Sequence, residues 1–261
     1  MSRARRAWRR QGPRPSLARA WQRFDRQLAA VDRLRSSQPR RAVRLALRAQ
    51  RQIETMAERV TRGAASPAIT GRWLQLEGRA WSAIGSCQRA TARDAASLQR
   101  AEDSFRRALA CFDGAHELAV DIEDDWARLS QRLAYLRFDQ GHSDEGFALL
   151  RDASRGHRRQ HRTDGRFRTL IDRAVLLGRA GGMARAVRLL ERLLAVHSRG
   201  RQRMRDDTHL AAVHNLAHGL VELADSDPAQ VARALLSLRA AIAAHAHVDD
   251  AESVGRNLNH A

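Results

Sequence analysis

The stretch LAYLRFDQGHSDEGFALLRDA, residues Leu133–Ala153, contains the end of one predicted helix, a tight turn and the start of a second helix. Its apolar residues recur at intervals of three and four on both sides of Gly141, as they do in amphipathic helices. Gly141 suits a helix C-terminus, and the following His142, Ser143 and Asp144 suit an N-cap. A single helical hairpin leaves an apolar face uncovered, so we expect copies of it on either side.

Length and composition point to an all-helical protein. The 261 residues are enough for a substantial core, and the abundant Ala, Leu and Arg are good helix formers. No segment alternates with the two-residue period of a strand, and no apolar run approaches the roughly 18 residues of a membrane span. The basic N-terminus lacks the apolar segment of a secretory signal, so we expect a cytoplasmic protein with no membrane partner. The Ala- and Arg-rich composition favours a bacterial source.

The positive charge is concentrated at the N-terminus. The chain has a net charge of +18, and residues 1–62 hold 18 arginines against four acidic residues, a net charge of +14. Residues 1–15 combine arginines with Pro13 and Pro15, which predicts a disordered basic arm. The alternatives are an arm that binds polyanions, with Trp8 available for stacking, and an organelle transit peptide.

Apolar residues at helical spacing, separated by turn residues, predict five hairpins along the rest of the chain. A polar tail is expected over residues 247–261. We expect the hairpins at residues 16–62, 69–112, 126–155, 167–197 and 208–246.

The second helices of the hairpins begin with a recurring pattern: a small residue, then a large apolar residue four positions later, then a small residue three positions after that. Ala101, Phe105 and Ala108 give the pattern in full, and Gly146, Leu150 and Ala153 repeat it. First helices pair an apolar residue with a small one, as in Ile84-Gly85, Leu133-Ala134 and Leu216-Ala217. Small residues of this kind allow neighbouring helices to cross closely.

This pattern resembles the tetratricopeptide repeat (TPR) over about residues 16–246. The anchors Ala101, Gly146, Ala186 and Ala232 are 45, 40 and 46 residues apart, whereas the standard TPR period is about 34. The chain therefore resembles the degenerate, long-period type. The resemblance implies an α-solenoid of about five antiparallel hairpins wound as a right-handed superhelix. The alternative is a non-repetitive helical bundle.

The resemblance also implies a concave groove, lined by first helices, that holds a peptide or a partner helix. For a single residue the alternative is a solvated helix face or, for Tyr135 and Ile171, a packing role. Such a groove would suit an acidic or amphipathic segment. The residues implied to face it are Arg128, Gln131, Arg132, Tyr135, Arg168, Ile171, Val175, His214, His218 and Glu222.

His214, His218 and Glu222 lie four residues apart on one helical face, a spacing that can bind a divalent metal. The zincin motif is absent because Asn215 stands where its glutamate would be. We therefore expect no metal and no other cofactor, and keep this trio as a minor alternative. Cys87 and Cys111 form no CxxC motif and predict small buried residues in a reducing compartment.

Two basic links, Arg155–Arg166 and Arg199–Arg205, follow the second helices of hairpins three and four. With the Arg-rich N-terminal quarter, residues 1–62, these links suggest an alternative function, the binding of nucleic acid through its phosphates. The simpler interpretation of the links is that they are solvated loops. The polyanion contacts would be Arg5, Arg6, Arg9, Arg10, Arg158, Arg159, Arg201 and Arg203.

The sequence contains no nucleotide-binding glycine loop, no Gly-x-Ser-x-Gly and no Cys/His pairing at catalytic spacing, so we expect no catalytic residues and no enzyme activity. The main hypothesis is a non-catalytic scaffold for protein–protein interaction. A further alternative is the regulatory or sensor part of a larger signalling system. The last hairpin shows no obvious long capping helix, and this favours dimerisation through that end.

Overall fold

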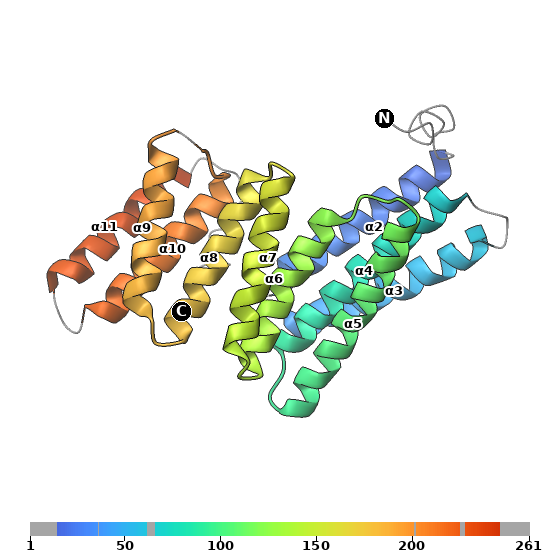
Figure 1. Ribbon diagram of the computed structural model, residues 1–261, viewed down its shortest axis with the longest axis horizontal. Coiled ribbons are helices and arrows are strands. Elements are labelled where there is room, and N and C mark those ends of the chain that lie inside the picture. The colour runs from blue at the N-terminus through green and yellow to red at the C-terminus, as the bar shows by residue number, and fades with distance from the viewer. Residues whose placement is uncertain (1–14, 36, 62–65, 201, 225–227, 246–261) are drawn as a thin grey trace. The chain divides into compact units, whose positions relative to one another are not determined.

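The computed structural model describes residues 15–35, 37–61, 66–200, 202–224 and 228–245, and within them it has ten helices and no strand (Figure 1). The prediction of an all-helical chain is confirmed for this part. The chain divides between Ile122 and Glu123 into two compact units, which we call unit 1 and unit 2. The predicted tail and residues 1–14 of the predicted arm lie outside the described residues, and Pro15, which we assigned to the arm, begins α2.

Unit 1 contains two antiparallel hairpins, α2 with α3 and α4 with α5. Its core is aromatic at one end, where the ring of Trp73 packs edge-on against those of Trp21 and Phe24, at centroid distances of 6.1 and 5.9 Å. Asp94 caps α5 by accepting a hydrogen bond from the Ser97 amide. The helices are α2 (Pro15–Leu34), α3 (Pro39–Thr61), α4 (Pro67–Ala90) and α5 (Ala95–Glu117).

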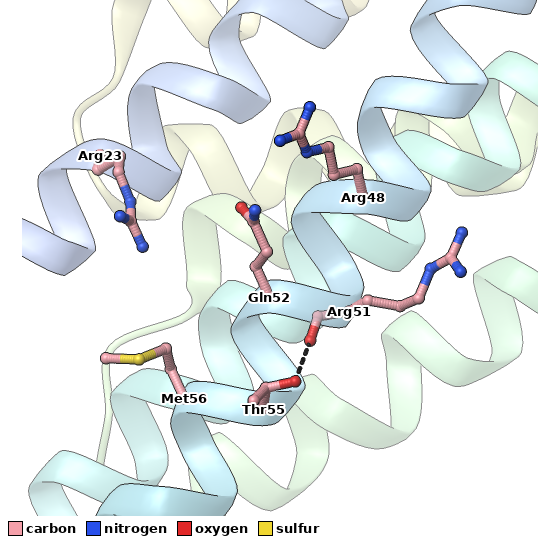
Figure 2. Close-up of a pocket in the computed structure, with 6 residues that line it drawn as sticks. All are labelled: Arg23, Arg48, Arg51, Gln52, Thr55 and Met56. Carbon is pink, nitrogen blue, oxygen red and sulfur yellow. Dashed lines mark hydrogen bonds between the residues drawn. The ribbon is translucent and has the colours of Figure 1, made fainter.

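Close helix crossings in unit 1 use the small residues that the repeat pattern predicts. The ring of Phe105 on α5 lies where a Cβ on Gly85 of α4 would be only 2.9 Å away. Two turns further on, Phe112 lies against Gly78 in the same way. Between α2 and α3 the surface is hollowed into a groove flanked by arginines (Figure 2).

Unit 2 contains three hairpins in which each helix contacts the next along the chain. The first helices also contact one another, α6 with α8 and α8 with α10, and so form a continuous layer. The helices are α6 (Glu123–Asp139), α7 (Ser143–Arg159), α8 (Thr163–Arg179), α9 (Met183–Ser198), α10 (Asp206–Leu223) and α11 (Pro228–His245).

The turn at Gly141 has the predicted form. Gly141 adopts a φ of +87°, its amide donates to the Phe138 carbonyl and the next amide donates to the Arg137 carbonyl, which is the Schellman pattern. Gly181, forty residues later, ends α8 in the same way with a φ of +79°. The N-cap of α7 falls on His142, whose side chain makes no cap hydrogen bond.

Two strongly charged stretches of unit 2 lie at helix ends. Glu123, Asp124 and Asp125 form the first turn of α6, where their negative charges interact favourably with the positive end of the helix dipole. His157, Arg158 and Arg159 form the last turn of α7, where positive charge is favoured. Arg158 and Arg159 are therefore helical residues, and not loop residues as we predicted.

In α11, the second helix of the last hairpin, the residues of the repeat pattern are not the ones that are buried. Helix α11 buries Ala234, whereas Ala232 and Leu236 are exposed, Leu236 by 66%. The expected anchor role of Ala232 is wrong at this hairpin.

Candidate functional site

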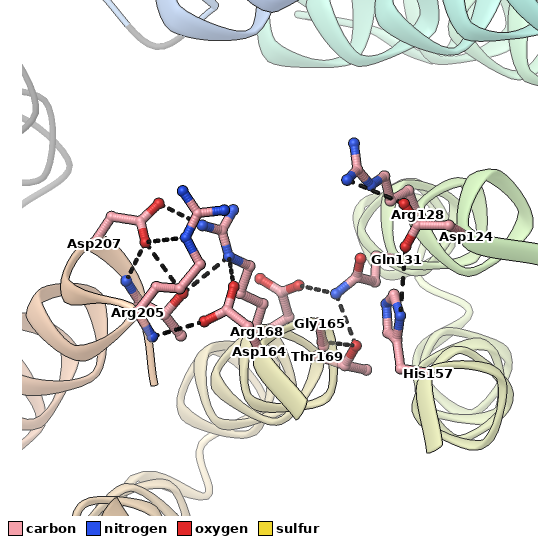
Figure 3. A network of polar contacts seen from close by, with 12 residues as sticks. Asp124, Arg128, Gln131, His157, Asp164, Gly165, Arg168, Thr169, Arg205 and Asp207 are labelled. Carbon is pink, nitrogen blue, oxygen red and sulfur yellow. Dashed lines mark hydrogen bonds and ion pairs between the residues drawn. The ribbon is translucent and has the colours of Figure 1, made fainter. Parts of the chain in front are cut away.

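The first helices of unit 2 carry all ten residues that the sequence predicts for a groove, and three of them form polar contacts with the neighbouring first helix (Figure 3). Between α6 and α8, Gln131 donates to the Thr169 hydroxyl at 2.8 Å and to the Asp172 carboxylate at 3.2 Å. The Tyr135 hydroxyl donates to the other oxygen of Asp172 at 2.8 Å. Gln131 and Tyr135 therefore hold α6 against α8.

A second set of contacts joins α8 to α10. The Arg168 guanidinium donates to Asp164 at 3.1 Å on its own helix and to the Thr208 hydroxyl at 3.0 Å on α10. It also pairs with Asp207. The Arg205 amide donates to the remaining oxygen of Asp164 at 3.0 Å. We call these two sets of contacts together the α6–α8–α10 network.

Electrostatics in this network are largely balanced. Burial alone would raise the pKa of Asp207, but the charge and hydrogen bond of Arg168 outweigh it, and the pKa is lowered. On α6, Arg128 pairs with Asp124 at 3.1 Å, and Arg162 pairs with the same carboxylate at 3.0 Å. The positive charges of Arg128 and Arg168 are therefore partly neutralised by acids of the same unit.

The remaining predicted groove residues differ in accessibility. Ile171 is buried in the core of unit 2, so it packs and does not line a surface. Arg132, Val175 and His214 are half-buried. His218 and Glu222 are exposed and lie 3.9 Å apart on α10.

The histidine face of α10 does not form a metal site in the structure. No group of three His, Cys, Asp or Glu side chains is placed to hold a metal ion anywhere in the described residues, and His214, His218 and Glu222 are no exception. The same residues include no helix long and apolar enough to cross a membrane.

The predicted polyanion contacts are dispersed. Arg158, Arg159 and Arg203 are exposed, the first two on α7 and the third on the link before α10. Arg5, Arg6, Arg9, Arg10 and Arg201 lie outside the described residues.

Cys87 and Cys111 are free thiols. Cys87 is buried as predicted, whereas Cys111 is only partly buried. Burial, with a smaller contribution from Glu77, raises the pKa of Cys111 to about 12. A thiol with so high a pKa is a poor nucleophile at neutral pH.

Sequence reasoning missed Asp164, Thr169, Asp172 and Asp207. A signal for one of them is present: Asp164 and Arg168 lie forty residues after Asp124 and Arg128, the spacing of hairpins three and four. Thr169 and Asp172 have no such counterpart, because forty residues earlier the chain has Leu129 and Arg132. Their roles depend on which faces of α6 and α8 meet.

Comparison with solved structures identifies the fold. The chain is similar to a kinesin light chain candidate with nearly identical TPR-like repeats from Podosopora anserina, at 18% identity and a TM-score of 0.50, over 86% of this chain and 97% of that one. A point variant of that protein gives 19% identity and the same TM-score, over 86% and 96% of the two chains. BtubC (BKLC) from P. vanneervenii gives 14% identity and a TM-score of 0.54, over 90% and 94%.

This chain has a TPR-like fold. The predicted resemblance is thus confirmed at the level of the helical repeat architecture. No family sequence model matches the chain, and no curated protein matches its sequence.

Proposed function

We propose that the protein is a non-catalytic scaffold that binds a peptide or partner helix on the first-helix layer of unit 2. The observation that carries the proposal is the α6–α8–α10 network, which fixes side chains of three consecutive hairpins relative to one another. A surface held in this way before binding loses less conformational entropy when a partner binds.

The charges of the layer favour a partner that has both polar and apolar side chains. Arg128 and Arg168 keep exposed guanidinium surface, but each already has a carboxylate partner. An acidic segment would compete with Asp124 and Asp164, whereas an amphipathic helix would add contacts to the half-buried Val175 and His214. We therefore favour an amphipathic partner over a purely acidic one.

The test is peptide selection against the full-length protein, followed by titration of the best peptide. Arg128→Ala combined with His218→Ala removes two side chains from opposite ends of the layer, and we expect affinity to fall about tenfold, or about 1.4 kcal/mol. Arg151→Ala, an exposed change on α7, is the matched control and should leave affinity unchanged. Equal losses in both variants would refute the placement of the site.

A further inference from the structure

Helix α3 of unit 1 has a row of arginines along one face. Arg40, Arg44, Arg48 and Arg51 are spaced at four, four and three residues, which places them within one helical stripe about 16 Å long. All four are exposed, while Ala42, Ala46, Ala49 and Ile53 on the opposite side are buried. We call these four residues the α3 arginine stripe.

A groove lies at each end of the stripe. Arg40 and Arg44 line one of about 590 Å³, and Arg93, from the turn before α5, lines it from the other side. Arg48 and Arg51 line the other, of about 570 Å³, with Arg23 and Gln52. In Figure 2, Arg23 of α2 and Gln52 of α3 reach into the space between the two helices, and Arg51 extends away along the far side of α3. Residues distant in sequence thus add positive charge at both ends.

The charge of the stripe is not neutralised within the described part of unit 1. No hydrogen bond or ion pair there uses the guanidinium of Arg40, Arg44, Arg48 or Arg51. Two acidic residues of α2 and α3 contact other side chains. Asp25 pairs with Arg72 and Arg79 at 3.1 and 3.0 Å, and Glu54 accepts from Gln50 at 3.2 Å. By contrast, Arg128, Arg168 and Arg179, three arginines on the first helices of unit 2, each have a carboxylate partner.

We propose that the α3 arginine stripe binds the phosphate backbone of a nucleic acid strand. Guanidinium groups donate paired hydrogen bonds to phosphate oxygens, and a line of them that rises by about 5 to 6 Å from one to the next presents repeated contacts to a linear polyanion. Each phosphate neutralised releases counterions, so such binding is independent of sequence and steeply dependent on salt.

The surroundings of the stripe argue against other polyanionic surfaces. The core of a typical protein interface is apolar or aromatic, and an amphipathic helix on a membrane buries apolar side chains among the lipids. The large apolar side chains that are exposed in the described residues are Leu109, Val221, Leu235 and Leu236, and none of them lies on α3. The inference is independent of the proposed peptide site, because the stripe and that site lie in different units.

The test uses the full-length protein and fluorescence anisotropy with a labelled single-stranded RNA and a labelled DNA duplex, each of about 20 nucleotides or base pairs, between about 50 and 200 mM salt. One variant carries Arg40→Gln, Arg44→Gln, Arg48→Gln and Arg51→Gln. The matched control removes the same charge from exposed arginines of unit 2, by Arg151→Gln, Arg173→Gln, Arg188→Gln and Arg192→Gln. The N-terminal arm is present in both proteins, so any difference between them reports the stripe.

We expect the stripe variant to lose about tenfold or more in affinity at about 50 mM salt, and its salt slope on duplex DNA to fall by about 3 to 4. The control should keep the wild-type slope. A milder variant, Arg44→Gln with Arg48→Gln, should show about half of that fall in slope and guards against misfolding of the fourfold variant. Equal losses in variant and control would overturn the proposal, and so would polyglutamate competing as well as unlabelled RNA of equal charge.

Discussion

The hydroxyl of Tyr135 on α6 donates a 2.8 Å hydrogen bond to the carboxylate of Asp172 on α8. Tyr135 is the single tyrosine of the chain, and its ring also packs beside the cluster formed by Ala134, Leu150 and Leu176. One side chain therefore serves the apolar contact within its hairpin and the polar contact to the next. Tyr135→Phe separates these roles, because the ring stays and the donor is lost.

For Tyr135→Phe we expect unit 2 to lose about 1 kcal/mol of stability, which is below the usual range for a hydrogen bond to a charged group because the pair is partly exposed. The loss should appear as faster amide hydrogen exchange in peptides from α6 and α8. Peptides from α2 and α3 in unit 1 are the internal reference. Unchanged exchange in α6 and α8 would mean that the hydrogen bond adds nothing to the contact between these hairpins.

Two glycines of α7 provide a matched pair for testing the repeat packing. A Cβ on Gly146 would lie 2.8 Å from the backbone oxygen of Ala134, whereas a Cβ on Gly156 would meet the nearest side chain at 3.6 Å, an ordinary contact. Gly146→Ala should destabilise unit 2 by about 1 to 3 kcal/mol, because backbone must shift. Gly156→Ala should stabilise it by up to about 1 kcal/mol through helix propensity.

Urea denaturation followed by circular dichroism measures both glycine variants under the same conditions. The informative quantity is the difference between them, since both replace glycine by alanine in the same helix. Similar midpoints for the two variants would show that the close approach of α6 and α7 at Gly146 is not a constraint on the repeat.

Much of the architecture follows from the sequence because its determinants are local. Gly141 and Gly181 end helices in a left-handed conformation that glycine adopts without strain, and the small residues at Gly85 and Gly146 mark close crossings. Helix ends were harder to predict in charged stretches. Glu123–Asp125 and His157–Arg159 resemble polar links in the sequence, but they form helix termini, where their charges are stabilising.

The contacts between hairpins were less predictable. Amphipathic patterning shows which face of α8 is apolar, but it does not show that Ile171 points into the core while Thr169 and Asp172 meet α6. These pairings depend on the crossing of two helices about forty residues apart, which no local pattern encodes. The same holds in unit 1, where Arg23 and Arg93 come to the two ends of the α3 arginine stripe.

The two thiols provide a probe of unit 1. Cys87 is fully buried, and Cys111 has its pKa raised to about 12, so almost no thiolate is present near neutral pH. We expect both to react with a disulfide reagent about a thousandfold more slowly in the native protein than in urea. Single Cys87→Ala and Cys111→Ala variants assign the two rates, and fast reaction of Cys111 in the native state would contradict its placement.

His157 should make the stability of unit 2 dependent on pH. Its side chain is 2% exposed at the contact of α7 with α8, and neither ring nitrogen has a hydrogen-bond partner in the described residues. Burial is the largest influence on its pKa and lowers it. The positive charges of Arg128 and Arg162 lower the pKa further, whereas the carboxylates of Asp124 and, more weakly, Asp164 raise it. The Asp124 carboxylate lies 3.8 Å from Nδ1.

The direction of the effect follows from linkage. Because the folded pKa lies below the ordinary histidine value of about 6.5, the unfolded chain binds the proton more readily. The contribution of His157 to stability is therefore fully present above about pH 6.5 and is lost progressively as the pH falls from there toward the folded pKa.

The measurement is the urea midpoint at about pH 7.5, 6.5 and 5.5 for the wild type, His157→Met and His142→Gln, the last being an exposed histidine of the same unit. We expect the decrease in midpoint between the highest and the lowest pH to be smaller in His157→Met than in the wild type, and unchanged in His142→Gln. The comparison of slopes stays valid even if methionine packs less well, because a packing loss lowers the midpoint equally at every pH. Parallel curves for all three proteins would show that His157 binds protons equally in the folded and unfolded states over this range, and would contradict the prediction.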